Sequence, residues 1–261
     1  MLFSKRLEKI ALEKESKLVL ALDVTKEVKP GVKASIVKRQ ILSKALEIFN
    51  QVSPFIVALK INFHLLLPLD LYGEFQELVN TAKDEKVALI ADCKVNDIGS
   101  TNTWVAKHLF NAGFDAVIAN PIAGWEGGLD SLFREARKRE KGILLLCYMS
   151  HPGAREGYGL NVNTYRGLKP LYILFAENAV KWGADGVIVG ATHPEKIKEV
   201  KRVVGEIPIF SPGVVTQGGD PATALKAGAD YLIVGRYVTE SKKPGETARG
   251  LANLTKQWLK L

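Results

Sequence analysis

Two carboxylates and an ammonium group occur within six residues in the run Ala91–Ile98. The run directly follows Val87–Ile90, an apolar segment that is typical of a strand. Side chains alternate between the two faces of a strand, so Asp92 and Lys94 are expected on the same side. Asp97 follows after the chain has turned out of the strand. Alternating charges at a strand exit indicate chemistry that moves a proton, and we expect the active site here.

Strand-like and helix-like segments alternate along the whole chain. Short β-branched runs predict strands at Leu18–Val24, Phe55–Ile61, Val87–Asp92, Ala116–Asn120, Ile143–Met149, Gly186–Gly190, Pro208–Ser211 and Tyr231–Gly235. Helical patterns are found at Ser35–Asn50, Leu71–Lys83, Thr103–Ala112, Leu129–Lys138, Leu171–Trp182, Pro194–Val204, Pro221–Ala227 and Glu246–Lys260. Three of these helices are followed by a glycine stop that leads into the next strand: Gly113, Gly183 and Gly228.

Eight strands alternating with eight helices predict an α/β fold, a (β/α)8 TIM barrel. We expect a single catalytic domain over residues 17–261, preceded by a helical extension over residues 1–16. A doubly wound open sheet is the alternative. The barrel predicts that polar residues gather at the carboxyl ends of the strands. They do so at Asp23, Lys60, Asn62, Asp92, Lys94, Asp97, Asn120, Ser150, His151, Thr192, Ser211 and Arg236.

Lys60 is a charge within the apolar strand segment Ala58–Ile61. Lysine is rarely buried without a partner, and Asp92 at the end of the next strand is the expected one. A buried ion pair that only orders the barrel mouth is the alternative. We favour a functional role, because an apolar pair is usually no less stabilising.

A glycine-rich loop, Ser211–Pro221, leaves the seventh predicted strand. Asp220 is a suitable N-cap, and Pro221 takes the first helical position. Loops after the seventh and eighth strands of such barrels often bind phosphate with a helix N-terminus. Arg236, one strand later, offers a guanidinium that binds phosphate bidentately. Together they predict a phosphate site, although the loop alone also fits a plain surface turn.

Ser150 and His151 follow the fifth predicted strand and suggest a nucleophile and its base. Neighbouring residues on a strand point in opposite directions, however, and no third member of a triad is evident. We therefore expect Ser150 to bind a polar edge of a ligand and His151 to order its loop. The following stretch, Arg155–Pro170, is interpreted as a long loop over the site mouth or as an ordinary excursion.

Composition narrows the class of protein. The net charge of +8 fits an anionic ligand, nucleic acid or a lysine-rich surface, and the scattered basic residues argue against nucleic acid. Cys93 and Cys147 form no disulfide framework or metal-ligand spacing, which suits a reducing cytosol. The N-terminus lacks the pattern of a signal peptide, and no uncharged apolar run reaches about 18 residues. We expect a cytoplasmic protein with no membrane partner.

From about Lys17 to Ser241, the chain resembles orotidine 5′-monophosphate decarboxylases. The resemblance rests on Leu20–Asp23, Lys60, the D-x-K-x-x-D-I element Asp92–Ile98 with Thr101 and Asn102, the segment Met149–Gly153, the loop Ser211–Pro221 and the segment Val234–Arg236. It implies conversion of orotidine monophosphate (OMP) to uridine monophosphate (UMP) and carbon dioxide in pyrimidine synthesis. It further implies a homodimer that uses no metal and no cofactor.

The resemblance also implies the roles of individual residues. The catalytic set is Lys60, Asp92, Lys94 and Asp97. Lys94 protonates the carbon that loses carbon dioxide, and Asp97 reaches into the neighbouring subunit's site. The substrate-binding set is Asp23, Ile98, Thr101, Ser150, Pro212, Gln217, Gly235 and Arg236. Within it, Asp23 and Thr101 hold ribose hydroxyls, Ser150 the pyrimidine edge, and Gln217 and Arg236 the phosphate.

Some positions depart from the family pattern. Asn120 stands where a histidine is common in archaeal relatives, Cys93 replaces a larger residue, and Arg155–Pro170 is longer than in compact members.

Two rivals to the decarboxylase remain. One is a Mg²⁺-dependent sugar-phosphate enzyme that shares the barrel and the D-x-K-x-x-D element. The other is a non-catalytic barrel that binds nucleotide or RNA through its basic surface.

Overall fold

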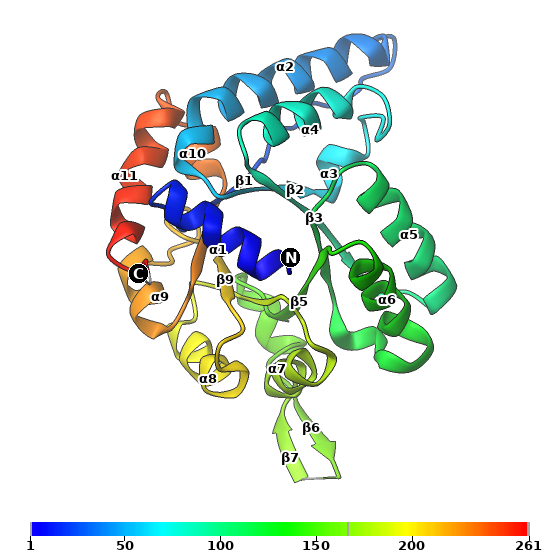
Figure 1. Cartoon of the computed structure of the whole chain (residues 1–261), viewed down its shortest axis with the longest axis vertical. Helices are drawn as coiled ribbons and strands as arrows, with labels where there is room; N and C mark the ends of the chain where they lie inside the picture. The colour runs from blue at the N-terminus through cyan, green and yellow to red at the C-terminus, as the bar shows by residue number, and fades with distance from the viewer. Residues whose placement is uncertain (1, 166, 260–261) are drawn as a thin grey trace.

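A computed structural model describes residues 2–165 and 167–259, and its central feature is a closed parallel barrel (Figure 1). The barrel strands are β1 (Leu18–Ala21), β2 (Ala58–Asn62), β3 (Ala88–Val95), β4 (Ala116–Ala119), β5 (Gly142–Tyr148), β8 (Gly186–Val189), β9 (Ile209–Pro212) and β10 (Tyr231–Val234). Because β1 pairs with both β2 and β10, the sheet closes. The predicted TIM barrel is confirmed, and the open sheet is excluded.

In the described part of the chain, eight helices surround the strands, and each overlaps one predicted helix. They are α2 (Ala34–Val52), α4 (Phe75–Asp84), α5 (Gly99–Asn111), α6 (Asp130–Lys138), α7 (Leu171–Trp182), α8 (Pro194–Val204), α9 (Pro221–Ala227) and α11 (Pro244–Lys256). The predicted end of the last helix at Lys260 lies outside the described residues. Short helices α3 (Phe63–Leu66) and α10 (Arg236–Thr239) follow β2 and β10. Within residues 2–165 and 167–259, no helix is long and apolar enough to cross a membrane.

The strands separate two apolar cores. Outward-facing residues such as Leu20 and Leu59 pack against the helices. Inward-facing residues such as Val19, Ala88 and Phe210 fill the barrel. This alternation follows the period of two along a strand. The inward positions are apolar through the barrel body, so polar side chains are confined to its carboxyl-terminal mouth.

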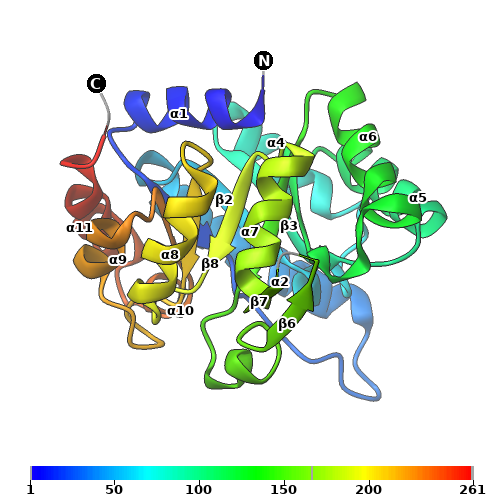
Figure 2. The same ribbon diagram turned by 90° about the horizontal axis from the view of Figure 1, so that it is seen from below.

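The N-terminal helix α1 (Phe3–Glu13) lies across the opposite end of the barrel (Figures 1 and 2). Its buried residues Phe3, Leu7 and Ala11 pack into the interior core rather than onto the surface. The Phe3 ring occupies the space left by Gly142, where a Cβ atom would lie 2.6 Å from the ring. The segment that the sequence presents as an extension is therefore the plug of the barrel.

Three aspartates at the amino-terminal ends of strands hold the barrel together from the same side. The carboxylates of Asp115, Asp185 and Asp230 accept the backbone N–H groups of Leu89, Ile143 and Ile209 on the neighbouring strands at 2.9–3.0 Å. Each aspartate stands two residues after one of the predicted glycine stops, which explains the repeated αβ pattern. Asp115 also pairs with Arg6 of α1 at 2.8 Å, so the same device helps to dock the plug.

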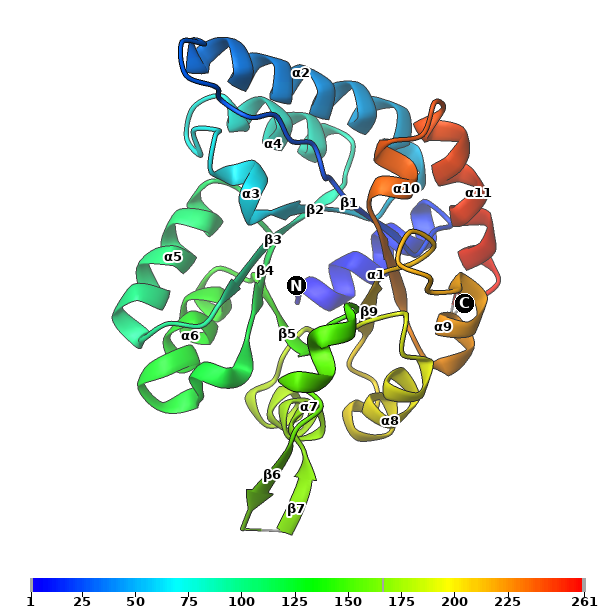
Figure 3. The same ribbon diagram turned by 180° about the vertical axis from the view of Figure 1, so that it is seen from behind.

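The segment that follows β5 forms a hairpin, β6 (Asn161–Thr164) with β7 (Gly167–Pro170). The hairpin projects away from the barrel axis (Figures 1 and 3). Lys169 of β7 pairs with Glu177 of α7 at 2.6 Å, which ties the hairpin to the outside of the barrel. The expectation of a loop over the site mouth is wrong for this part, and the ordinary excursion is the better interpretation.

The plug predicts a measurable contribution to stability. We expect Phe3→Ala to lower the free energy of unfolding by about 3–5 kcal/mol, because a buried ring is lost and a cavity remains. Urea denaturation followed by circular dichroism measures this loss. The matched control is Leu2→Ala, since Leu2 is 69% exposed and its removal is expected to change stability by less than about 0.5 kcal/mol. Equal effects of the two substitutions would contradict a plug that belongs to the core.

Candidate active site

A cavity of about 210 Å³ opens at the carboxyl-terminal mouth of the barrel. Its floor is apolar and consists of Ala21, Ile118, Leu146, Ile188 and Ile233. Its walls carry the polar side chains Asp23, Lys60, Asn62, Asp92, Lys94, Ser150, Gln217 and Arg236. An apolar base with a few converging polar groups is typical of a small-molecule site.

Asp92 lies between two lysines inside this cavity. Its Oδ2 atom accepts a hydrogen bond from Lys60 Nζ at 2.6 Å, and its Oδ1 atom accepts one from Lys94 Nζ at 2.7 Å. The predicted Lys60–Asp92 pair and the shared side of Asp92 and Lys94 are both confirmed. The side chains of Lys60 and Asp92 are only 6% and 10% exposed, whereas that of Lys94 is 41% exposed. Lys94 is therefore the cation that can meet a ligand.

The charges of this cluster decide its protonation. Burial by itself would raise the pKa of Asp92, but the ammonium groups of Lys60 and Lys94 outweigh it and hold the pKa below its usual value. The pKa of Cys93, which lies between Asp92 and Lys94 in the sequence, shifts in the opposite direction. Burial, together with the negative charge of Asp92, raises the pKa of the Cys93 thiol to about 11. Cys93 is accordingly a neutral thiol at pH 7, which argues against a role as nucleophile.

A bulge in β3 aims Lys94 at the cavity. The pairing of β3 with β4 shifts register between Ala91 and Val95, and Lys94 has a φ of +46°. This left-handed conformation is unfavourable for a residue with a Cβ atom. Such strain persists where the surrounding structure fixes it, and it is concentrated at functional sites. The sequence gives no sign of the bulge.

The predicted phosphate loop forms the opposite wall. Gly219 N donates to Gly213 O at 3.1 Å and Val215 N donates to Gly219 O at 2.8 Å, so the loop is closed on itself. Asp220 accepts from Thr223 N at 2.8 Å, which confirms the predicted N-cap. Pro212, Gln217, Gly235 and Arg236 line the cavity at this side.

Ser150 stands between the phosphate loop and the charged cluster. Its carbonyl accepts a hydrogen bond from Thr192 Oγ1 at 2.8 Å. Two glycines allow this close packing, because a Cβ atom on Gly190 or Gly213 would lie within 2.7 Å of Ser150. His151 does not line the cavity. This placement agrees with the expectation that the two residues do not act as a catalytic pair.

Three predicted residues lie outside the cavity of this chain: Asp97, Ile98 and Thr101 are exposed at the start of α5. The backbone of Asp97 is nevertheless fixed by Asn102, which is completely buried. Asn102 Nδ2 donates to Asp97 O at 2.5 Å, and Asn102 Oδ1 accepts from Asp97 N at 3.1 Å. The sequence places Asn102 next to Thr101 but does not reveal this role.

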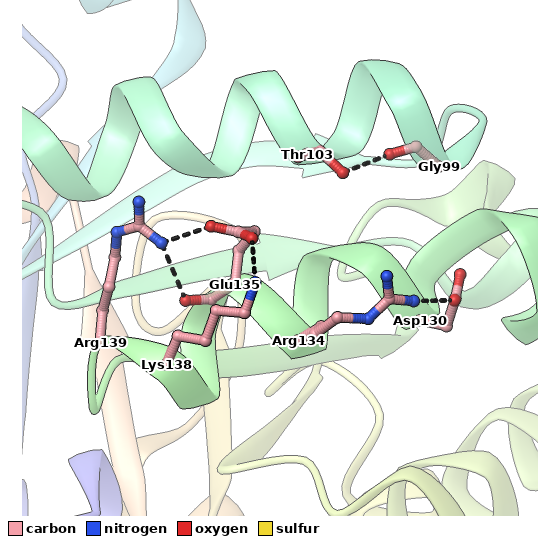
Figure 4. Close-up of polar contacts among 7 residues, drawn as sticks. All are labelled: Gly99, Thr103, Asp130, Arg134, Glu135, Lys138 and Arg139. Carbon is pink, nitrogen blue, oxygen red and sulfur yellow. Dashed lines mark hydrogen bonds and ion pairs between the residues drawn. The ribbon is translucent and has the colours of Figure 1, made fainter.

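Helix α5 is itself seated on α6 (Figure 4). A Cβ atom on Gly99 would lie 3.2 Å from Gly127 O, so glycine permits the close approach at the start of α5. Ion pairs along α6 and its C-cap join Arg134 to Asp130, and Lys138 and Arg139 to Glu135. Asp97 is thus held by Asn102 at the start of a helix that packs on α6.

Other polar strand exits have different environments. Asn120 Nδ2 donates to the Tyr158 hydroxyl at 3.1 Å outside the cavity. Ser211 is fully buried and does not line the cavity. Asn62, by contrast, lies in the cavity wall, although its place in the sequence predicts no role for it. Among residues 2–165 and 167–259, no cluster of three or more histidine, cysteine, aspartate or glutamate side chains is arranged to hold a metal ion.

Comparison with known proteins places these features in a family context. The family model described as orotidine 5′-phosphate decarboxylase / HUMPS family matches residues 16–251. The chain is 35% identical to the orotidine 5′-phosphate decarboxylase of Methanococcoides burtonii, over 93% of this chain and 98% of that protein. It is also 35% identical to the Pyrococcus furiosus protein of the same name, over 82% and 93% of the two chains.

Solved structures show the same similarity. The orotidine 5′-monophosphate decarboxylase of Methanocaldococcus jannaschii, complexed with the inhibitor BMP, is 29% identical and superposes with a TM-score of 0.72. That match covers 94% of this chain and 99% of the other. The decarboxylase of Pyrococcus horikoshii is 32% identical with a TM-score of 0.70, over 90% and 97% of the two chains.

The buried cluster predicts how stability depends on pH. We expect Lys60→Met to lower the free energy of unfolding at pH 7 by about 3 kcal/mol, because Asp92 loses a buried partner. The folded-state pKa of Asp92 is below its reference value of 3.8, so this contribution is present above that pH. It is lost as the pH falls through the lowered pKa, and the difference between wild type and variant narrows below about pH 4.

Urea denaturation at a series of pH values measures this difference. Lys44→Met is the matched control, because Lys44 and its partner Glu47 are at least half exposed. That exposed pair contributes less than about 1 kcal/mol. A Lys60→Met variant that is no less stable than this control would show that the pair is not a buried constraint.

Proposed function

Because the chain belongs to the orotidine 5′-phosphate decarboxylase / HUMPS family, we propose that it decarboxylates OMP to UMP in pyrimidine nucleotide synthesis. The observation that carries the proposal is the buried Asp92, which contacts both Lys60 and Lys94 within 2.7 Å in a cavity that also contains a phosphate-type loop. The family description covers two activities. The similar proteins named above are all decarboxylases of orotidine 5′-phosphate, which favours that activity.

The reaction follows from the charges of the cluster. The bond between the pyrimidine ring and the substrate carboxylate breaks, carbon dioxide leaves, and the electron pair remains on the ring carbon. The Lys94 ammonium stabilises this charge without reorganisation, because Asp92 already holds it in place. Lys94 then donates a proton and a carbon–hydrogen bond forms. Asp92 faces the substrate carboxylate, and Lys60 keeps Asp92 ionised and in position.

The remaining walls position the nucleotide. Gln217 and Arg236 bind the phosphate, beside a loop whose amides are already ordered. Asp23 holds a ribose hydroxyl and Ser150 the pyrimidine edge. Pro212 and Gly235 shape the wall between them. Contacts with the phosphate, remote from the reacting carbon, supply binding energy that holds the ring against Lys94.

The site is completed by a second copy of the chain. Asp97, Ile98 and Thr101 are exposed and lie outside their own chain's cavity. Large apolar side chains are exposed on α3, at and after the N-cap of α5, and in the short helical segment after β4: Phe63, Ile98, Trp104 and Ile122, each at least 55%. Exposed apolar surface of this kind marks an interface. In the dimer, Asp97 joins the partner's charged cluster, and Ile98 and Thr101 contact the partner's substrate.

The proposed chemistry needs no metal and no cofactor, and we place the enzyme in the cytoplasm without a nucleic-acid or membrane partner. Two free thiols, Cys93 and Cys147, are compatible with a reducing compartment. The Mg²⁺-dependent sugar-phosphate enzyme is the second candidate, because it shares the barrel and the charged element. Metal dependence separates the two.

The decisive assay is the consumption of OMP, followed by ultraviolet absorbance with and without EDTA. We expect turnover that EDTA leaves unchanged, and that Lys94→Ala lowers kcat at least about 10³-fold by removing the proton donor. Lys181→Ala is the control, since Lys181 is an exposed lysine of α7 that does not line the cavity. Folded protein that consumes only sugar phosphates, and only with Mg²⁺, would favour the rival enzyme.

Mixing two inactive variants tests the shared site. Lys94→Ala and Asp97→Ala are each expected to abolish most activity. In a mixed dimer, one site contains both lesions and the other contains neither. Random assortment therefore restores about 25% of wild-type activity on mixing. A mixture that stays as inactive as its components would show that Asp97 does not act on the partner's site.

A further inference from the structure

The side chain of Asn62 connects two parts of the cavity that are otherwise separate. Asn62 Nδ2 donates a hydrogen bond to Asp23 Oδ1 at 2.6 Å, and Asn62 Oδ1 accepts one from Lys60 Nζ. Lys60 in turn donates to Asp92. The result is a continuous chain of hydrogen bonds from Asp23 on the β1 side to Lys94 on β3.

An amide is suited to this position in a way that other side chains are not. One of its atoms must accept from an ammonium group and the other must donate to a carboxylate, which also fixes the orientation of the amide. A carboxylate in place of Asn62 would repel Asp23, and an apolar side chain would leave both neighbours with one partner fewer. Lys60 and Asn62 share a face of β2 because they are two residues apart.

The bridge determines which oxygen of Asp23 remains for a ligand. Oδ1 is occupied by Asn62, whereas no residue in the described part of the chain donates a hydrogen bond to Oδ2. Oδ2 lies beside Gly235, where a Cβ atom would be only 2.5 Å away. Gly235 and Arg236 line the phosphate side of the cavity. Asp23 therefore presents Oδ2 between the charged cluster and the phosphate loop.

We propose that Asn62 is a positioning residue that fixes Asp23 for a ribose hydroxyl and couples it to the Lys60–Asp92–Lys94 cluster. The inference rests on the proposed function, since it assigns the sugar of the nucleotide to Asp23. Asn62 does its work through Asp23 and Lys60, and it contributes to the recognition of a hydroxylated sugar. It also supplies Lys60 with an uncharged second acceptor, so that Lys60 is held without another negative charge beside Asp92.

Binding of UMP and of 2′,3′-dideoxyuridine monophosphate tests the recognition step. Wild-type protein is expected to prefer UMP by at least about tenfold, because a hydrogen bond to a charged group is lost with the analogue. In Asn62→Ala this preference falls about fivefold or more, while affinity for the dideoxy analogue changes little. Asn120→Ala is the matched control, since Asn120 is an amide at a neighbouring strand exit outside the cavity. Its preference is expected to equal that of wild type.

The pH profile of Asn62→Asp tests the bridge itself. The introduced carboxyl contacts Lys60 on one side and Asp23 on the other, and Asp92, Lys94 and Arg236 also line the cavity. Asp23 is the acid in contact with it, so one of these two acids binds a proton more readily. Once protonated, the introduced group donates to Asp23 and accepts from Lys60, as the amide does. We therefore expect kcat/KM of this variant, relative to wild type, to recover at least about fivefold between pH 8 and pH 5.

The outcomes distinguish this inference from the proposed function. Wild-type protein that consumes OMP, with Asn62 variants that keep its sugar preference and its pH profile, would overturn the inference alone. Wild-type protein that neither binds UMP nor consumes OMP would overturn the proposed function and the inference with it. A variant that fails to fold loses affinity for UMP and for the dideoxy analogue by the same factor. If Asn62→Ala behaves in this way, its preference for UMP is unchanged and the positioning role is contradicted.

Discussion

The buried carboxylate of Asp92 is the constraint on which the site depends. A charge removed from water must be balanced, and two ammonium groups lie within 2.7 Å of Asp92. One anion and two cations leave a single net positive charge in the cluster. That excess charge suits an anionic ligand. It is accessible to such a ligand on Lys94, because Lys94 is the more exposed of the two lysines. The buried Lys60 holds Asp92, and the more exposed Lys94 is left to contact a ligand.

The barrel supplies the geometry that this cluster needs. Parallel pairing places Asn62 opposite Asp92, and Lys60 two residues deeper in the barrel, opposite Ile90. The Lys60 side chain therefore extends from the edge of the apolar interior toward the mouth to reach the Asp92 carboxylate. The bulge in β3 then brings the Lys94 ammonium group to the other oxygen of the same carboxylate. At the other end, α1 lies across the barrel and buries Phe3, Leu7 and Ala11 in the interior core. An apolar floor of low polarity strengthens the charge interactions above it.

The sequence predicts those features that depend on local periodicity and on residue type. The barrel, the Lys60–Asp92 pair and the Asp220 N-cap follow from apolar alternation, from the rule that charges are buried in pairs, and from capping preferences. Other features depend on contacts between distant segments. Nothing in the spacing of Phe3, Leu7 and Ala11 says whether that face meets the barrel end or solvent. The left-handed φ of Lys94, and the double role of Asn62 as hydrogen-bond donor to Asp23 and acceptor from Lys60, likewise exist only once β1, β2 and β3 are side by side. The β6–β7 hairpin was not predicted, because its polar residues and glycines are also typical of an irregular loop.

The rigid presentation of Asp97 bears on the proposed dimer. An exposed carboxylate on a mobile loop would lose conformational freedom on entering a partner's site, and that loss would oppose association. Here Asn102 fixes the backbone of Asp97, and α5 is already packed on α6. The ordering therefore takes place when each chain folds, not when two chains meet. Exposed apolar residues beside Asp97 can then drive association, and the same contact that buries them delivers the carboxylate. On this view, dimer formation and completion of the catalytic cluster are one event with one free energy.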